Sequence, residues 1–168
     1  KDLDTGEFKG ALAKSWRFID PTTMEFELRE GVKFHNGAAF TADDVVTTLN
    51  TVVDPAYGAR YRIAVDWIRN VEKLGDFKVR INMAKPFAGA VEMLADALSI
   101  YPAAYFKEVG SAGMAAKPVG TGPYRLMEMT PGTRYVFERY DDHYAGSPKG
   151  RAAIKRIVVR TIPEKNTQ

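Results

Sequence analysis

The N-terminal part of the chain alternates apolar and polar residues with the two-residue period of a β-strand. Trp16 and Phe18 lie on one arm, Met24 and Phe26 lie on the other, and Pro21 stands in the turn between them. Because successive side chains of a strand point to opposite faces of a sheet, this pattern predicts a hairpin with one apolar face.

The same period returns further along the chain. Residues 68–74 predict one arm of a second hairpin, residues 75–76 its turn and residues 77–83 the other arm. Asn36 and Gly37 predict a further tight turn between the two hairpins, because both residues tolerate the backbone conformation of such turns. The first half of the chain is therefore expected to contain an antiparallel sheet.

Between the hairpins the apolar spacing changes to that of a helix. Thr41 and Asp44 resemble a capping box, in which the third position is aspartate in place of the usual glutamate. Apolar residues follow at helical spacing until Asp54 and Pro55, where the pattern ends. We therefore expect an amphipathic helix that begins after Thr41.

Shorter elements follow in the second half of the chain. Pro86 suits the first turn of a short helix, and another short helix is predicted from Ala103 to Val109. The small residues from Gly110 to Lys117 predict a linker or loop. Strands are then predicted from Tyr124 onwards, and the last of them, Ile154–Ile162, has the apolar character of a more fully buried strand.

This change of character marks a domain boundary near residue 112. We expect residues 1–112 to form one α+β unit and residues 113–168 to supply strands of a second, incomplete sheet. The chain starts without methionine at Lys1 and stops soon after a strand-like run, so we interpret it as part of a longer protein. It contains no internal repeat and no low-complexity tract.

Composition narrows the class of protein. Of the 168 residues, 45% are apolar and 27% are charged, which is typical of a globular protein and not of a disordered one. The absence of cysteine excludes disulfide scaffolds, zinc ribbons and thiol catalysis. The net charge is only +3, and the basic residues are spread along the chain apart from a group near its end, Lys149, Arg151, Lys155, Arg156 and Arg160. We interpret this group as a solvated face, so no nucleic-acid partner is expected. The sequence has no apolar run of the roughly 20 residues that a membrane-spanning helix needs.

The candidate catalytic and metal-binding motifs are incomplete. Residues 120–122 read Gly-Thr-Gly, but Pro123 follows in place of the Gly-Lys-Ser/Thr end of a phosphate-binding loop, so a structural turn is predicted. His35 and His143 have no closely spaced partners that would complete a zinc site, and His35 is expected to be a surface or hydrogen-bonding residue. No serine lies in a nucleophile elbow. We expect neither an enzyme nor a bound cofactor or metal.

Several segments together resemble a known family, family 5 of the bacterial extracellular solute-binding proteins, which includes dipeptide-, oligopeptide- and nickel-binding proteins of ABC importers. They occur in the family's order and cover nearly the whole chain: LAKSW at 12–16, FELREGVKFHNG at 26–37, FTADDV at 40–45, KPVGTGPY at 117–124, YDDHY at 140–144 and IVVRTIPEKNT at 157–167. Two positions depart from the family's usual pattern: His143 lies within the segment that usually ends in Tyr-Trp, and Glu164 stands where aspartate is commoner.

The resemblance implies a mixed α/β (α+β) structure that is part of a type II periplasmic binding protein fold. In this interpretation, residues 1–112 are the extra small domain attached to the first lobe, and residues 113–168 are strands of that lobe. The implied function is to bind a small solute, foremost a peptide, in a cleft between two lobes and to deliver it to the permease subunits of an ABC transporter. The implied location is the periplasm, or the outer surface of a Gram-positive cell.

Site residues follow from the resemblance alone. The segment from Asp96 to Ile100 aligns with one that faces the cleft in relatives, so Leu98 and Ser99 are candidate ligand contacts and Tyr61 is a candidate aromatic at the cleft rim. The alternative is structural: Leu98 and Ile100 would belong to the core, and Ser99 would only fill space or cap.

Two further alternatives stay open. The chain could be the ligand-sensing domain of a transcriptional regulator, and the N-terminus of the complete protein would decide between a signal peptide and a helix-turn-helix. Strands at 113–168 that lack their neighbours would present unpaired edges, so disorder there, or a dimer formed through these edges, is also expected.

Overall fold

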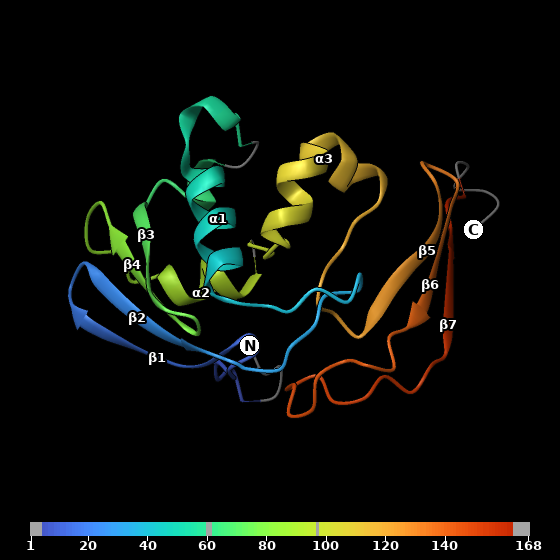
Figure 1. Cartoon of the computed structure of the whole chain (residues 1–168), viewed down its shortest axis with the longest axis horizontal. Helices are drawn as coiled ribbons and strands as arrows, with labels where there is room; N and C mark the ends of the chain where they lie inside the picture. Colours follow the sequence, from blue (N-terminus) through green and yellow to red (C-terminus); the bar gives the residue numbers. More distant parts are fainter. Residues whose placement is uncertain (1–4, 60–61, 97, 163–168) are drawn as a thin grey trace.

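The computed structural model describes residues 5–59, 62–96 and 98–162 (Figure 1). Its elements, in chain order, are β1 (Ala13–Asp20), β2 (Thr23–Leu28), α1 (Ala42–Val53), the 3-10 turns η1 (Pro55–Tyr57) and η2 (Arg62–Ala64), β3 (Ile68–Gly75), β4 (Lys78–Met83), α2 (Ala90–Asp96), α3 (Ala103–Ala116), β5 (Tyr124–Thr130), β6 (Arg134–Arg139) and β7 (Arg156–Arg160). The fold is mixed α/β, as predicted.

The first sheet contains β1 to β4 in the order β1-β2-β4-β3, and all its pairs are antiparallel. Both predicted hairpins are confirmed. The first turns at Asp20, whose carboxylate Oδ1 accepts a hydrogen bond from the Thr22 amide at 2.7 Å. The second turns between Gly75 and Lys78. The two hairpins join through β2 and β4, the inner strands of the sheet.

The core lies on one face of this sheet, under α1. Met24 pairs with Ile81 and Phe26 pairs with Val79 across β2 and β4, and all four side chains are buried. Leu49 of α1 is buried against the same cluster. Each such side chain contributes about 1.5–3 kcal/mol by leaving water, so this face accounts for most of the packing that holds the first sheet and α1 together.

The start and end of α1 follow the predicted signals. The Thr41 amide donates to the Asp44 Oδ2 atom at 2.8 Å, which is one half of the capping box, and Asp43 and Asp44 lie in the first turn at the positive end of the helix dipole. The helix ends at Val53, because Asp54 precedes Pro55 and takes an extended conformation with ψ at 122°.

Two predictions about the later helices are wrong. Pro86 does not lie in the first turn of α2, which begins at Ala90. The predicted linker from Gly110 to Lys117 is instead mostly helical, because α3 continues to Ala116 across a kink at Gly110. Gly110 has φ at 62° and ψ at −173°, a conformation that glycine adopts without strain, and the following Ala and Met residues favour a helix. Residue 112 therefore lies within α3.

The second sheet contains β5, β6 and β7 in that order, again antiparallel. The prediction of a buried last strand is wrong for this chain: β7 forms, but Val158 is 44% exposed and Val159 is 46% exposed. These two residues point to opposite faces, so β7 is apolar on both faces. Among the described residues, β7 pairs with β6 alone, so it is an edge strand of the second sheet.

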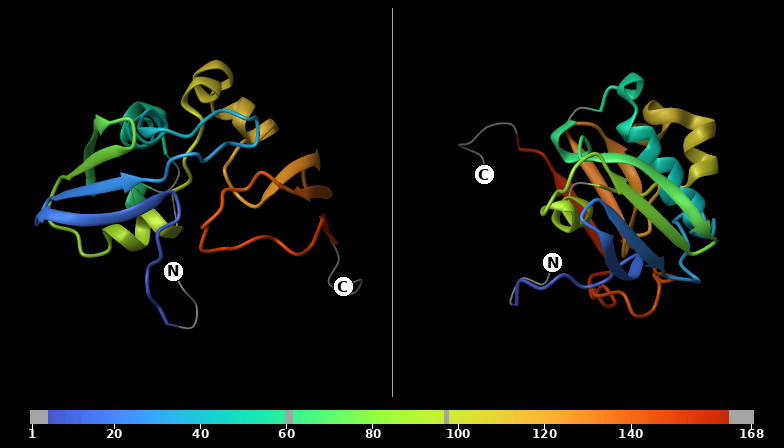
Figure 2. Two further views of the ribbon diagram at one scale, coloured as in Figure 1. Left: turned by 60° about the horizontal axis from the view of Figure 1, so that its bottom comes forward. Right: turned by 90° about the vertical axis from the view of Figure 1, so that its left-hand side faces the viewer.

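The two sheets stand at opposite ends of the molecule (Figures 1 and 2). The helices α1, α2 and α3 belong to the end that holds the first sheet. Residues 29–41 and residues 117–123 run side by side between the sheets, and they are joined by the hydrogen bond from the His35 amide to the Gly120 carbonyl at 2.8 Å. Val119 belongs to the core cluster of the first sheet, so this connection is packed as well as hydrogen-bonded.

Candidate functional site

Leu98 and Ser99, two of the candidate ligand contacts, lie in the irregular segment between α2 and α3. Leu98 is half-buried and packs against the core, as does Ile100, whereas Ser99 is exposed. Tyr61, the third candidate, lies outside the described residues. The segment thus presents the Ser99 hydroxyl to solvent from a backbone whose neighbouring side chains are anchored.

Buried polar side chains of α1 hold the end of this segment. Thr48 is only 3% exposed, and its hydroxyl accepts from the Tyr101 amide at 3.0 Å and lies 3.3 Å from the Tyr101 carbonyl. Asp44 is 7% exposed, and its Oδ1 atom accepts from the Ala103 amide at 2.8 Å. Because Oδ2 of the same carboxylate serves the capping box, one side chain fixes the start of both α1 and α3.

Three aromatic rings gather beside the anchored segment. Tyr101 stacks on Phe106 with ring centroids 5.6 Å apart, and Tyr57 meets Phe106 edge-on at 6.3 Å. Burial raises the pKa of the Tyr101 hydroxyl, and the neighbouring Tyr57 acts in the same direction. The Tyr101 hydroxyl therefore stays protonated and keeps its hydrogen to donate.

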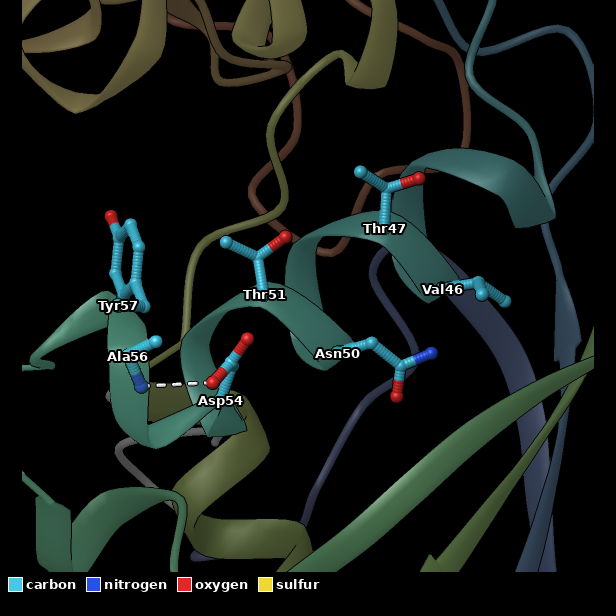
Figure 3. Close-up of a pocket in the computed structure, with 7 residues that line it drawn as sticks. All are labelled: Val46, Thr47, Asn50, Thr51, Asp54, Ala56 and Tyr57. Carbon is cyan, nitrogen blue, oxygen red and sulfur yellow. Dashed lines mark hydrogen bonds between the residues drawn. The ribbon is translucent and has the colours of Figure 1, made fainter.

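A shallow groove follows the outer side of α1. One part has a volume of about 530 Å³ (Figure 3), and its lining comprises Val46, Thr47, Asn50, Thr51, Asp54, Ala56 and Tyr57. A smaller part of about 330 Å³ is lined by Thr47, Thr51, Ala103, Ala104, Phe106 and Lys107. Thr47 and Thr51 line both parts, so the two parts adjoin along α1: the larger part extends to η1 and the smaller part lies between α1 and α3.

The chemistry of the groove suits binding. The Asp54 carboxylate accepts from the Ala56 amide at 2.8 Å, as Figure 3 shows, and the Asn50 amide pairs with the backbone of Val71. The hydroxyls of Thr47 and Thr51 project from the same side of α1 (Figure 3). A hydroxyl-lined surface beside aromatic rings offers hydrogen bonds and apolar contact to a polar ligand.

The sequence analysis missed the groove and the anchoring role of α1. One signal was present: Asp44 and Thr48 lie four residues apart, which places both on one face of the helix with Leu49 nearby. Polar residues on the inner face of an amphipathic helix need partners, but nothing in the sequence identifies those partners as the backbone of Tyr101 and Ala103.

Both histidines contact the Gly-Thr-Gly segment at residues 120–122. His35 is half-buried and hydrogen-bonded to Gly120 and Gly122, and His143 Nδ1 lies 3.1 Å from the Thr121 carbonyl. The segment forms a bend before β5, so the predicted structural turn is confirmed. In the described part of the chain, no three His, Asp or Glu side chains gather in a way that could hold a metal ion. None of the helices described is both long and apolar enough to cross a membrane.

Comparison with known proteins places this geometry in a family. A family model for the middle part of the bacterial extracellular solute-binding proteins, family 5, matches residues 7–168. The glutathione-binding protein GsiB of Escherichia coli O1:K1 / APEC is 36% identical over an alignment of 170 positions, gaps included, that covers 96% of this chain and 31% of GsiB. Heme-binding protein A of Haemophilus influenzae is 30% identical over an alignment of 185 positions, gaps included, that covers 96% of this chain and 33% of the relative.

Solved structures show the same fold. The oligopeptide-binding protein AppA of Bacillus subtilis, in complex with a nonapeptide, matches with a TM-score of 0.80 and 27% identity over 94% of this chain and 32% of AppA. NikZ of Campylobacter jejuni, in complex with Ni(L-His), matches with a TM-score of 0.81 and 25% identity over 92% of this chain and 31% of NikZ. The chain spans about a third of the length of these relatives, and it has the fold of that part of a type II periplasmic binding protein.

Proposed function

The chain belongs to the bacterial extracellular solute-binding proteins of family 5, and from this we propose that it forms part of one wall of a cleft in which the complete protein binds a small solute. The match of the family model to residues 7–168 carries this proposal. The proposed role is binding and delivery, without chemical change of the solute.

We propose a peptide as the solute. AppA of B. subtilis was solved with a nonapeptide, and GsiB binds glutathione, which is itself a peptide. Other relatives bind haem or nickel, so the family's cleft accepts several classes of ligand. An extended peptide offers regularly spaced backbone donors and acceptors, which a cleft wall can pair with whatever the peptide's side chains are.

Within the wall, the proposed ligand contacts are Leu98, Ser99 and Tyr61. Support comes from the anchoring of the segment, because Thr48 and Asp44 fix the backbone at Tyr101 and Ala103. A hydroxyl on a fixed backbone loses little entropy when a ligand binds it. Ser99 would offer a hydrogen bond to the peptide backbone and Leu98 an apolar contact. Tyr61 would contribute a ring at the rim.

Delivery requires a partner and a second lobe. We propose that closure of the complete protein around the solute creates the form that the permease subunits of an ABC transporter recognise. The proposed location is therefore outside the cytoplasmic membrane, in the periplasm or anchored to the outer surface of the cell. The curated relatives that match this chain are about three times as long, so this chain would supply only a part of the surfaces involved.

A thermal-shift screen of the full-length protein tests the proposed solute, with the 168-residue chain measured in parallel. The ligands are di- to hexapeptides, nickel chelates, opines and oligosaccharides. A ligand at a hundredfold excess over its Kd stabilises its receptor by about 2.7 kcal/mol. We expect the full-length protein to respond to peptides and the 168-residue chain to respond to none. Full stabilisation of the 168-residue chain alone would contradict the partial-wall proposal.

The proposed contact at Ser99 has its own test. Ser99→Ala in the full-length protein is expected to weaken peptide binding about threefold to tenfold, the effect of one lost hydrogen bond. Ser111→Ala is the matched control, because Ser111 is also exposed but lies on α3. Equal affinities of the two variants, measured by isothermal titration calorimetry, would remove Ser99 from the site.

A further inference from the structure

The connection between the two sheets contains a histidine whose ring bonds two backbone groups. We define the histidine joint as His35, the bend at residues 120–122, Tyr140 and His143. The Gly120 amide donates to His35 Nδ1 at 3.3 Å, and His35 Nε2 lies 2.9 Å from the Gly122 carbonyl. The ring thus closes a bridge between the loop after β2 and the segment that leads into β5.

The partners of His35 fix its tautomer. A backbone amide only donates and a carbonyl only accepts, so Nδ1 must be the bare nitrogen and Nε2 must carry the hydrogen. A proton added to Nδ1 would face the hydrogen of the Gly120 amide. The protonated ring therefore loses one of its two bonds and places two donors against each other, which is unfavourable in a half-buried position.

His143 lies across the same bend and responds differently. Its Nδ1 atom lies 3.1 Å from the Thr121 carbonyl, so Nδ1 carries the hydrogen, and Nε2 has no hydrogen-bond partner among the described residues. Burial lowers the pKa of His143 as well. Protonation of this ring adds a hydrogen at the buried Nε2 atom but leaves the bond to Thr121 in place. The chain therefore provides its own control for the effect of a histidine charge near the joint.

We propose that the histidine joint is a pH-sensitive connection: protonation of His35 breaks its bond with the Gly120 amide and loosens the attachment of the first sheet and its helices to the second sheet. The joint loosens without coming apart, because the Tyr140 hydroxyl also donates to the Phe34 carbonyl at 3.1 Å and Val119 stays in the core. The proposed effect of pH on the histidine joint does not depend on whether a solute is bound.

The charged and titratable groups around the His35 ring also disfavour its protonation in the folded chain. Burial lowers the pKa of His35, the bond to the Gly122 carbonyl opposes that change, and the charges of Arg125 and His143 add to it. The ring of Tyr140 lies 5.1 Å away, and burial raises the pKa of its hydroxyl, so Tyr140 stays neutral. The neighbour Asp142 also raises the pKa of Tyr140 and is not among the groups that shift His35.

The sign of the effect follows from the lowered pKa. The unfolded chain binds a proton at His35 near the ordinary histidine pKa of about 6.5, and the folded chain resists it until lower pH. The contribution of the joint is therefore fully present above the ordinary value and is lost as the pH falls through the folded value.

The direct test is a titration of the 168-residue chain by NMR, which needs no variant. Imidazole nitrogen shifts report the tautomer and the pKa of each histidine, and hydrogen exchange reports opening at the Gly120 amide. We expect His35 as the Nε2–H tautomer with a lowered pKa, and an opening of the Gly120 amide that increases about threefold to tenfold as the ring titrates, after correction for intrinsic exchange. An ordinary or raised pKa, or exchange at Gly120 that does not follow the ring, would overturn the proposal.

A pair of variants separates the two histidines. His35→Gln keeps a donor for the Gly122 carbonyl and cannot titrate in this range, so the pH dependence of Gly120 exchange is expected to disappear. His143→Gln is the matched control and should keep that dependence. The reverse result, with the dependence lost in His143→Gln and kept in His35→Gln, would show that the switch lies elsewhere. If His35→Gln does not fold, the titration of the unmodified chain still decides.

Discussion

The two sheets of this chain are built from similar strands but are covered very differently. The first sheet has α1 on one face, and there Met24, Ile81 and Leu49 are almost completely buried. The second sheet has three strands and no helix of the described residues against β7, whose Val158 and Val159 are about half exposed. An apolar stretch of strand-forming residues is therefore enough to form a strand, but a packed core also needs a neighbouring element.

The outer faces of the two sheets differ as well. On the first sheet, Glu25 is 8% exposed at its side chain and pairs with Arg17, Lys78 and Arg80 on both neighbouring strands. On the second sheet, Glu128 is 53% exposed and pairs with Arg134 and Arg156 near the end of β5. Ion pairs contribute most where solvent is excluded, so the first sheet is expected to gain more from its charges.

The largest expected difference between the two sheets is in the free energy of unfolding that a core side chain contributes. Leu49→Ala should lower the free energy of unfolding by about 2–5 kcal/mol, because it leaves a cavity between α1 and the first sheet. Alanine is a good helix former, so the loss reports packing and not helix propensity. Urea unfolding followed by tryptophan fluorescence measures it, since both tryptophans, Trp16 and Trp67, lie in the part of the chain that holds the first sheet.

Val158→Ala on β7 is the matched control for the second sheet. Its expected cost is about 0.5–1 kcal/mol, since the side chain is 44% exposed and leaves no closed cavity. Equal costs for Leu49→Ala and Val158→Ala would mean that β7 is covered in solution, for example by a second molecule.

The second prediction concerns the polar contacts of α1. Thr48→Val keeps the shape of the side chain but leaves the Tyr101 amide without its partner, which should cost about 1–3 kcal/mol. Thr47→Val, one residue earlier in the groove, should be nearly neutral because Thr47 is only half-buried. Hydrogen exchange at Tyr101 should rise in the first variant alone. If both variants behave alike, α1 does not anchor the segment that carries Ser99.

The third prediction uses the charge on the first sheet. Hydrogen bonds from Arg80 and Arg17 lower the pKa of Glu25 to about 2, from an ordinary value of 4.5. The stabilisation is present above the ordinary value and is lost as the pH falls from about 4.5 towards 2. In Glu25→Gln the thermal midpoint should be lower at neutral pH and should depend less on pH over this range. Glu128→Gln, on the second sheet, is the matched control, because its side chain is 53% exposed and exposed ion pairs contribute little to stability.

Local patterns predicted the hairpins and α1 because the groups that decide them are neighbours in the sequence. Thr41 and Asp44 are three residues apart, and Phe18 pairs with Met24 across the short turn of the first hairpin, where both arms have the alternating pattern of a strand that buries one face. The helical end of α3 was missed because its small residues suit a loop and a helix equally, and only Gly110 marks the kink.

The candidate site could be predicted only by resemblance. The segment around Ser99 was identified from its likeness to a family, and the membership of that family is confirmed, but the role of Ser99 stays a prediction. The hydrogen bonds that hold this segment join Thr48 to Tyr101 and Asp44 to Ala103, which are 53 and 59 positions apart in the sequence. No local rule connects residues at such distances, and the same is true of the contact between His35 and Gly120.

The smallest expected effect concerns association of the 168-residue chain. We propose that the outer edge of β7 pairs weakly with a second copy, because among the described residues no strand lies beside β7 on the side away from β6. Arg156 and Arg160 at the ends of the strand oppose tight pairing, so the association should be weak and concentration-dependent in analytical ultracentrifugation.

Two variants, one on an edge strand of each sheet, show which sheet makes this contact. Val158→Lys adds a charge in the middle of β7 and should shift the chain towards the monomer, with a cost in the free energy of unfolding of about 0.5–1 kcal/mol, similar to that of Val158→Ala. Ile19→Lys places the same charge on β1, the exposed edge strand of the first sheet, where Ile19 is 46% exposed, and should leave association unchanged. The opposite result would move the contact to the first sheet. A strictly monomeric chain with ordered β5, β6 and β7 would contradict the proposed pairing of the β7 edge.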